Sequence, residues 1–299
     1  MWFMYAILTF TCWGIADLFY KIGNEGDGNY NHLKTGVMVG LVMGIHAIIY
    51  LAINNVSISL IGIVKYLPVS LLYISSMIIG YKGLKYLELS ISSPIQNTSG
   101  VITALLLIIF FNEQYELPFY IAVILIFIGI FMLSLVELNN NKDERAEYKK
   151  KTIRSKVITL TIIFPLIYCL LDGLGTFLDS IYLDKLELIN EDSALVSYEL
   201  TFALYALITY IYLKIKKINF NFSLDKSKLL AAIFETMGQF FYVFAMANNS
   251  TISAPIVGSY CVLSMILSRV FLKEKLTKKE YISIIVVLIG IFILAVLDI

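Results

Sequence analysis

The sequence predicts an all-α integral membrane protein with ten transmembrane helices, arranged as two inverted five-helix repeats. The first supporting observation is composition: 59% of the 299 residues are hydrophobic and 15% are charged, whereas ordinary soluble domains are about a quarter charged. The second is a duplication, because residues 91–133 align without a gap to residues 252–294 and share 16 identities in 43 positions. Apolar bias alone does not explain the identical pairs Pro94 and Pro255, Phe110 and Phe271, Glu113 and Glu274, Tyr120 and Tyr281, and Gly129 and Gly290.

The third observation is a series of ten apolar stretches, each close to the roughly 20 residues that a helix needs to cross a bilayer. No Lys or Arg precedes the first stretch, so we expect a retained span rather than a cleavable signal. An odd number of spans in each half makes the second half enter the membrane from the opposite side, as an inverted repeat requires. The expected spans are Trp2–Lys21, His32–Ile53, Lys65–Leu84, Leu89–Phe111, Pro118–Leu138, Val157–Ile181, Ser193–Tyr212, Lys228–Ala247, Ser250–Leu272 and Lys279–Leu297.

A polar stretch divides the chain into two halves. We expect a first five-helix repeat at 1–138, a polar linker at 139–156 and a second five-helix repeat at 157–299. The loops on the linker's side of the membrane hold 21 of the 23 Lys and Arg residues, whereas the other side holds Lys65 and Lys185. By the positive-inside rule, the linker is cytoplasmic and both chain termini lie outside, in a multi-pass protein of the cell membrane.

Short motifs stand at matching places in the two halves. They are Trp13-Gly14 in the first span, the apolar run that ends the fourth span before Glu113, Gly129-Ile130 in the fifth span, and the counterparts Glu274 and Gly290-Ile291. With these features the chain resembles the drug/metabolite transporter superfamily, and within it the EamA-type ten-helix transporters. The resemblance covers nearly the whole chain. It implies a secondary transporter, not an enzyme, with a central cavity lined mainly by spans one, three, four, six, eight and nine.

Two features depart from the pattern of the family. Many relatives place their termini in the cytoplasm, whereas the charge distribution here places them outside. Many relatives also carry a proline late in the fourth span, and this chain has Gly100 near that place. The second departure leaves the fold untouched but weakens any inference about how the fourth helix bends.

Polar side chains inside the spans are the candidates for a substrate site. A charged side chain in lipid costs roughly 2.5–3.5 kcal/mol on insertion scales, so it tends to mark a pathway or a partner. Asp17 lies one helical turn after Trp13, and Asp172 and Thr176 repeat this spacing in the sixth span. Asp17 and Asp172 lie at similar depths, so we expect them to be related by the repeat. The predicted substrate-binding residues are Trp13, Asp17, Gln96, Asn97, Tyr168, Asp172, Thr176, Glu235, Gln239, Tyr242 and Tyr260.

The sign of the charges inside the spans predicts the kind of substrate. Asp17, Asp172, Glu199 and Glu235 lie well inside, whereas the basic candidates lie near span ends, where they can reach the interface. Carboxylates supply negative charge, and aromatic faces bind ammonium groups. We therefore expect a small cationic or zwitterionic amine or amino acid to be transported by alternating access. A buried carboxylate that binds a proton and the substrate in alternation would also allow proton coupling.

Several of these residues also have structural explanations. Asp17 can pair with Lys21 at the end of its helix, and Asp179 lies close enough to the membrane surface to be solvated. Glu199 can hydrogen-bond to a neighbouring helix, and His46 in its apolar helix is explained by packing.

Two further patterns have structural explanations. Gly36, Gly40 and Gly44 predict close packing of the second helix. Glu113 and Glu274 mark the same loop in both repeats, which favours helix caps or gate contacts.

No motif predicts catalysis, a cofactor or a metal site. The chain lacks a GxxxxGK[ST] phosphate loop, HExxH and GxSxG, and it has two histidines. Its three cysteines fall in apolar stretches without metal-ligand spacing, and a net charge of +1 gives no basic field for nucleic acid. The expected partners are a small-molecule substrate, the lipid bilayer and, with coupling, protons. A monomer and a homodimer both fit.

Other substrates are compatible with the same fold. The neutral polar run in the fourth span would suit a sugar or a nucleotide-sugar, and acids that are dispensable for binding would favour that alternative. A lipid-head-group flippase is a second alternative, indicated by a lateral opening between helices.

Overall fold

The computed structural model has helices and no strand in the residues that it describes, which are 2–24, 30–54, 60–86, 89–112, 114–148, 154–220, 225–273 and 276–297. Side chains are described in these ranges except at 90–91, 133–148, 154–162 and 295. The helices are α1 (Trp2–Asn24), α2 (Asn31–Asn54), α3 (Leu60–Gly83), α4 (Leu89–Phe111), α5 (Leu117–Tyr148), α6 (Arg154–Ser180), α7 (Glu191–Ile215), α8 (Lys226–Gly258), α9 (Cys261–Leu267) and α10 (Lys278–Leu297), with π-helical turns η1 (Ile181–Lys185) and η2 (Ser268–Leu272).

Seven stretches of the described chain are long and apolar enough to cross a membrane. The predicted all-helical membrane class is therefore confirmed. The longest stretch, Lys226–Leu272, has 47 residues, whereas one crossing needs roughly 20. Helical geometry breaks within it at Asn249, where φ is −163° and ψ is 83°, between the expected eighth and ninth spans. The count of ten spans and the inversion of the repeat stay predictions.

The predicted linker at 139–156 is partly helical. α5 was expected to end near Leu138 but continues to Tyr148, and α6 begins at Arg154. The added stretch contains Ala, Glu, Lys and Arg, which favour helix even outside a membrane. The polar composition of the linker therefore does not end the helix, and the division of the chain there into two repeats stays a prediction. The predicted caps or gate contacts at Glu113 and Glu274 lie outside the described residues.

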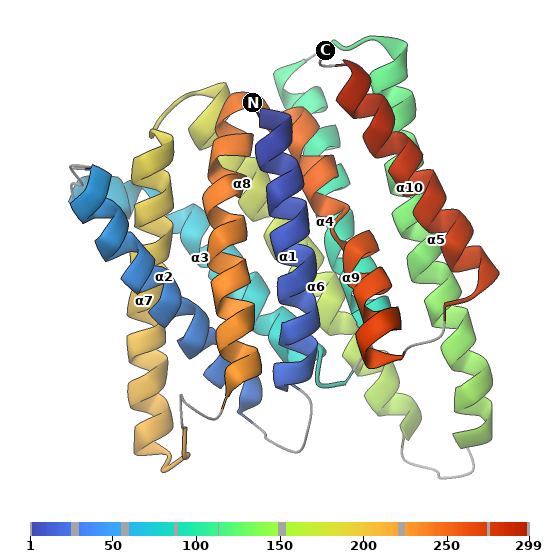
Figure 1. Cartoon of the computed structure of the whole chain (residues 1–299), viewed down its shortest axis with the longest axis horizontal. Coiled ribbons are helices and arrows are strands. Elements are labelled where there is room, and N and C mark those ends of the chain that lie inside the picture. The colour runs from blue at the N-terminus through green and yellow to red at the C-terminus, as the bar shows by residue number, and fades with distance from the viewer. Residues whose placement is uncertain are drawn as a thin grey trace.

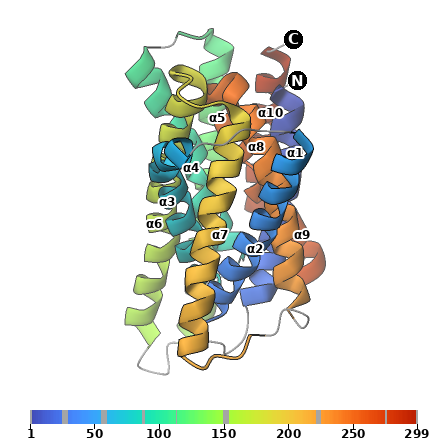
Figure 2. The same ribbon diagram turned by 90° about the vertical axis from the view of Figure 1, so that its left-hand side faces the viewer.

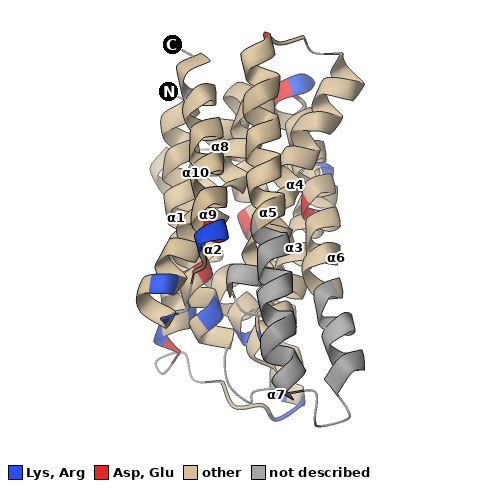
Figure 3. Ribbon diagram, turned by 90° about the vertical axis from the view of Figure 1, so that its right-hand side faces the viewer, with Lys and Arg blue, Asp and Glu red and all other residues tan. Residues whose placement is uncertain are grey.

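The helices form one bundle in which partners come from opposite halves of the chain. α1 packs along α8, α3 along α6, α2 along α7, and α5 along α10 (Figure 1). Figure 2 looks onto α7 with α2 beside it. α1 begins and α10 ends at the same end of the bundle, and the Lys and Arg residues of the described chain gather mostly toward the other end (Figure 3).

The outer faces of the bundle suit a lipid environment. Large apolar side chains such as Ile48 on α2, Leu170 on α6 and Phe292 on α10 are each more than half exposed. An apolar surface of this extent marks contact with a membrane or a partner, and the hydropathy of the helices favours the membrane. All three cysteines are buried and unpaired, as expected.

Glycines allow the closest helix contacts. A Cβ on Gly129 of α5 would lie 2.5 Å from Val287 Cγ2, and one on Gly290 of α10 would lie 2.6 Å from Ile126 Cγ1. On the α2–α7 seam, a Cβ on Gly40 would lie 2.4 Å from the Phe202 carbonyl oxygen. The predicted close packing of the second helix is thus confirmed.

Substituting Gly40 with Ala should destabilise the protein. The new methyl group would meet a backbone oxygen that cannot move independently, and such overpacking costs about 1–3 kcal/mol, more than the roughly 0.5–1 kcal/mol that Ala gains over Gly in a helix. We expect a lower thermal unfolding midpoint for the purified protein in detergent. Gly173→Ala is the matched control, because its Cβ would lie 3.6 Å from the nearest atom, Ser99 Cβ. Equal midpoints for the two variants would contradict the tight α2–α7 seam.

Candidate functional site

A cavity lies in the bundle between α1, α3, α4, α6, α7 and α8 and is closed on one side by Tyr260. The centres of water molecules can occupy about 60 Å³ of this cavity. By the same measure, a cavity needs roughly 10–15 Å³ to hold one water. In this conformation the cavity therefore holds several waters or one small solute. The structure brings together here all the sequence-predicted site residues, Trp13, Asp17, Gln96, Asn97, Tyr168, Asp172, Thr176, Glu235, Gln239, Tyr242 and Tyr260. Their role in binding stays a prediction.

The cavity extends from the middle of the bundle toward the end opposite the chain termini. Its wall includes Tyr81 near the end of α3, Leu84 just beyond that end, and Tyr20 near the end of α1. Lys21 donates a 3.1 Å hydrogen bond to the Leu84 carbonyl oxygen. The cavity thus approaches the end of the bundle at which most basic residues lie.

Asp17 connects three segments at the cavity wall. Its Oδ2 accepts a 2.5 Å hydrogen bond from Ser93 Oγ of α4 and a 2.9 Å bond from Ser264 Oγ of α9. The residue is 7% exposed. Pairing with Lys21 was one expectation for Asp17, but the structure supplies two neutral hydroxyl donors from helices of the other faces of the cavity.

Two further carboxylates stand around the same space. Asp172 Oδ2 accepts a 2.6 Å hydrogen bond from Ser99 Oγ, and Glu235 Oε2 accepts a 3.1 Å bond from Tyr20 OH. Both acids line the cavity. Each of these carboxylates therefore takes a hydroxyl donor from the protein while it faces the cavity.

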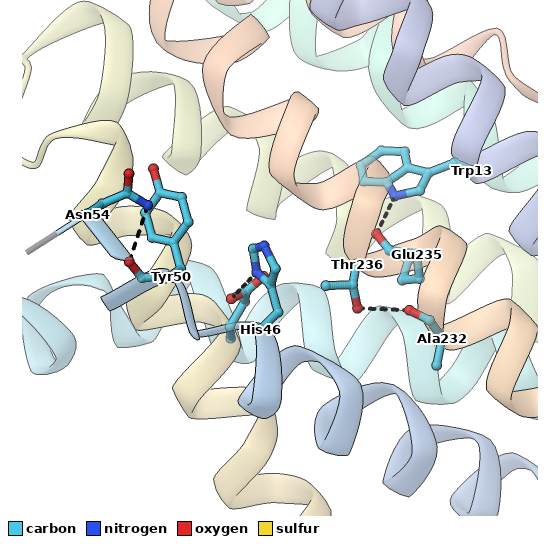
Figure 4. A network of polar contacts seen from close by, with 8 residues as sticks. Trp13, His46, Tyr50, Asn54, Ala232, Glu235 and Thr236 are labelled. Carbon is cyan, nitrogen blue, oxygen red and sulfur yellow. Dashed lines mark hydrogen bonds and ion pairs between the residues drawn. The ribbon is translucent and has the colours of Figure 1, made fainter. Parts of the chain in front are cut away.

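Aromatic rings form much of the remaining wall. The Trp13 ring lies 5.0 Å from Tyr242 and 5.8 Å from Tyr260, measured between centroids, and its indole nitrogen donates to the Glu235 carbonyl oxygen at 3.4 Å (Figure 4). Tyr20 and Tyr81 pack at 4.4 Å. Ring faces and carboxylates therefore surround one small volume.

The amide side chains at the cavity differ in whether their N–H groups have hydrogen-bond partners in the protein. Gln96 Nε2 donates to Ser92 Oγ at 3.1 Å, and Asn97 Nδ2 donates to the Ser93 carbonyl oxygen at 2.8 Å. Among the described residues, Gln239 Nε2 has no hydrogen-bond partner although the residue is 3% exposed. A buried unpaired donor is costly, and Gln239 lines the cavity, so a solute or water would satisfy it.

A network of hydroxyl groups closes the cavity toward the end that holds the chain termini. Tyr73 OH lies 2.6 Å from Tyr242 OH and 3.1 Å from Thr176 Oγ1. Asp179, expected to be solvated, is instead fully buried and accepts hydrogen bonds from Tyr66 and Tyr73. The expectation was wrong because α3 brings two tyrosines across to this acid.

The predicted set of substrate-binding residues lacks several residues that line the cavity. They are Tyr20, Tyr73, Met77, Tyr81, Ser99 and Tyr198. Tyrosine is common at membrane interfaces, so a tyrosine near a helix end, such as Tyr20 or Tyr81, does not by itself indicate a cavity. A signal was present at Tyr73 and Tyr81, because a spacing of eight residues places both on one face of a helix.

Comparison with known proteins gives a family and a fold. The model of the EamA-like transporter family matches residues 1–135 and 159–296. No curated protein matches the chain. Among solved structures, one described only as "Crystal structure of protein" superposes with a TM-score of 0.67, covering 98% of this chain and 96% of that chain at 10% identity. At this identity the likeness shows a shared fold and nothing about substrate.

The acids of the cavity should make it selective for cations, and Trp13 can report this. The chain has two tryptophans, so Trp2→Phe leaves Trp13 as the only one. We expect caesium to quench Trp13 fluorescence more than iodide does, with each ion normalised to its quenching of free tryptophan, because carboxylates attract cations and repel anions. Asp172→Asn should lower the caesium-to-iodide ratio, whereas Glu191→Gln, an acid at the start of α7, should leave it unchanged. A ratio equal to that of free tryptophan would argue against an acidic cavity.

Proposed function

The chain belongs to the EamA-like transporter family, and from this premise we propose that it is a secondary active transporter of a small cationic or zwitterionic amine or amino acid. Membership of the family makes it a membrane transporter of small solutes. The substrate class and the alternating-access mechanism are our proposal, and the cavity is the proposed binding site.

One observation carries the proposed substrate class. Asp17, Asp172 and Glu235 line the cavity, and among the described residues no Lys, Arg or His does. Opposite charges attract by about 4 kcal/mol at 4 Å where the effective dielectric constant is 20, so a cation gains and an anion loses on entering. A phosphate or nucleotide would face three carboxylates without a basic partner.

The aromatic wall supports the same substrate. An ammonium group over the face of Trp or Tyr gains roughly 0.5–2 kcal/mol, and Trp13, Tyr242 and Tyr260 present such rings beside the acids. The small volume favours a small metabolite over a nucleotide-sugar. A zwitterion would use the same acids for its ammonium group, and its acceptor group would suit the unpaired Gln239 Nε2.

The alternative of a sugar has less support from hydrogen bonding. The amide groups of Gln96 and Asn97 suggested a sugar site, but each amide nitrogen already donates one of its two N–H groups within α4. A neutral sugar would also leave three carboxylates in lipid without a cationic partner, which is unfavourable.

We propose ten spans in two inverted repeats as the topology. Gly129 contacts Val287 and Gly290 contacts Ile126, and each of these contacts is converted into the other by the same shift of 161 residues found in the sequence. The long stretch of α8 to η2, which breaks at Asn249, is long enough for two crossings.

A second pair of contacts supports the relation between the halves. Gly238 of α8 lies beneath Trp13 of α1, and Gly80 of α3 lies beneath Tyr168 of α6. The α1–α8 pair is therefore matched by the α6–α3 pair, as a twofold relation between the halves requires. In this arrangement the acids on α1 and α6 stand in equivalent places on opposite sides of the cavity.

Transport measured in proteoliposomes tests the proposed function. We expect currents with a panel of cationic amines and amino acids, and we expect Asp172→Asn and Glu235→Gln each to abolish them, because each removes negative charge from the cavity. Glu116→Gln is the matched control, since it removes an exposed acid just before α5 that does not line the cavity. If all substrates of the panel move normally after Asp17, Asp172 and Glu235 are each neutralised, the acidic-cavity mechanism is wrong. Movement of sugars alone would select the alternative.

We propose that the linker is cytoplasmic and that both termini lie outside. The basic residues near the end of the bundle opposite the termini support this orientation. A reporter enzyme that is active only in the cytoplasm should therefore stay inactive when fused after Ile299, and should be active when inserted in the 149–153 segment. An active C-terminal fusion together with an inactive linker fusion would reverse the orientation.

A further inference from the structure

A second group of titratable side chains lies between α2 and α7, outside the cavity. His46 Nδ1 lies 2.8 Å from Glu199 Oε1 and 2.9 Å from Oε2. The Glu199 side chain is fully buried, and the His46 side chain is 32% exposed. Neither lines the cavity, and Figure 4 shows His46 well apart from Trp13 and Glu235.

The surroundings of the imidazole connect it to the end of α7. The Tyr50 ring, one turn further along α2, lies 5.8 Å from the imidazole, and Tyr50 OH donates a 2.6 Å hydrogen bond to Asp192 Oδ1. Asp192 and its neighbour Glu191 occupy the first turn of α7. Asp192, Tyr50 and His46 thus form a row of titratable side chains from the start of α7 to the imidazole.

The side of the His46–Glu199 pair that faces α8 is apolar. Phe240 of α8 presents its ring 6.1 Å from the imidazole, nearly perpendicular to it, and 6.0 Å from the Tyr50 ring. The charged or titratable groups that face the pair therefore come from α2 and α7, and α8 contributes an aromatic cover.

The α2–α7 seam does not need this pair for packing. Gly40 already brings the two helices into contact at Phe202 and Ala206, and Gly44 does so at Ala203. A buried ion pair adds little stability on balance, because desolvation offsets the attraction. Neither packing nor stability therefore explains why two titratable side chains lie in the α2–α7 seam.

The geometry leaves room for one proton to come and go. Nδ1 faces the carboxylate, so the imidazole donates its N–H there, and Nε2 on the far side of the ring can take up a second proton. Uptake changes the pair from a neutral imidazole beside a carboxylate, with net charge −1, to an imidazolium–carboxylate pair with net charge zero. A net charge inside lipid is costly. Proton binding to the pair therefore changes the relative free energies of conformations in which the α2–α7 seam is buried and conformations in which it is hydrated.

We propose that His46 and Glu199 form a proton-binding site separate from the substrate cavity, reached from the start of α7 past Asp192 and Tyr50. The proton binds at the imidazole and leaves by the same route or through a hydrated seam. Its effect on transport rests on the proposed function, but proton binding itself does not.

Helix α7 supplies a physical connection between the two sites. Tyr198 precedes Glu199 and lines the cavity, where its hydroxyl lies 3.2 Å from Met77 Sδ and its ring packs 6.0 Å from Tyr73. A change in the α2–α7 seam therefore reaches the cavity wall through one residue of the same helix.

A pH step without substrate tests the site directly. Proteoliposomes on a solid-supported membrane are given a step in pH, and the displaced charge is recorded. The background variant is Asp172→Asn with Glu235→Gln, so that two cavity acids are neutral and transport is not needed. We expect charge displacement in this background, less displaced charge when His46→Gln is added, and a shift of the pH at which the charge moves when Glu199→Gln is added. His32→Gln, which removes the other histidine of the chain, should leave it unchanged.

A second measurement distinguishes loss of the proton-binding site from a folding defect. In the His32→Gln protein labelled with ¹⁵N-histidine in nanodiscs, His46 gives the only imidazole signal. We expect this signal to titrate in one step, and we expect Glu199→Gln to move the midpoint while the protein remains monodisperse. An imidazole that does not titrate between about pH 4 and 9, or a displaced charge that is the same with and without His46→Gln, would overturn the proposal. Either result would leave the cavity proposal untouched.

Discussion

Lipid offers no water to a carboxylate, so every acid inside this bundle must find its hydrogen-bond donors on neighbouring helices. Asp17 on α1 takes donors from Ser93 on α4 and Ser264 on α9. Asp172 on α6 takes its donor from Ser99, again on α4. The same bonds that satisfy the acids fix the helices around the cavity, so helix packing and the charge of the cavity are set together. α4 is central to this arrangement because it supplies hydroxyl groups to an acid from each half of the chain.

The two walls formed by α8 and α3 differ although each has a glycine packed against an aromatic ring. Gly238 lies beneath Trp13 as Gly80 lies beneath Tyr168. Three residues before these glycines, α8 has Glu235 and α3 has Met77. One residue after them, α8 has Gln239 and α3 has Tyr81. One wall is therefore acidic and polar and the other is apolar and aromatic, which suits a solute with a charged group at one end and an apolar body.

Much of this architecture could be predicted from local sequence. Apolar length predicts where the helices lie, although α5 continues into the polar linker as far as Tyr148. The four-residue spacing of Asp172 and Thr176 on α6 placed both on the cavity face. Contacts between distant segments could not be predicted this way. His46 and Glu199 are 153 positions apart, and nothing in either helix alone indicates the partner. Asp179 was misjudged for the same reason, since its burial depends on tyrosines that α3 brings from more than 100 positions away.

Separate sites for proton and substrate would have a consequence that a shared site lacks. Where both bind the same carboxylate, the proton must leave before the substrate enters, and occupancy by one excludes the other. A proton at His46 and Glu199 leaves the cavity acids available and acts instead through the position of α7. Because Tyr198 contacts Met77 and Tyr73 in the cavity wall, the α7 backbone couples the charge of the seam to the shape of the cavity. Such coupling is reciprocal by thermodynamic necessity: a solute that shifts α7 must change proton affinity at the seam by the same factor.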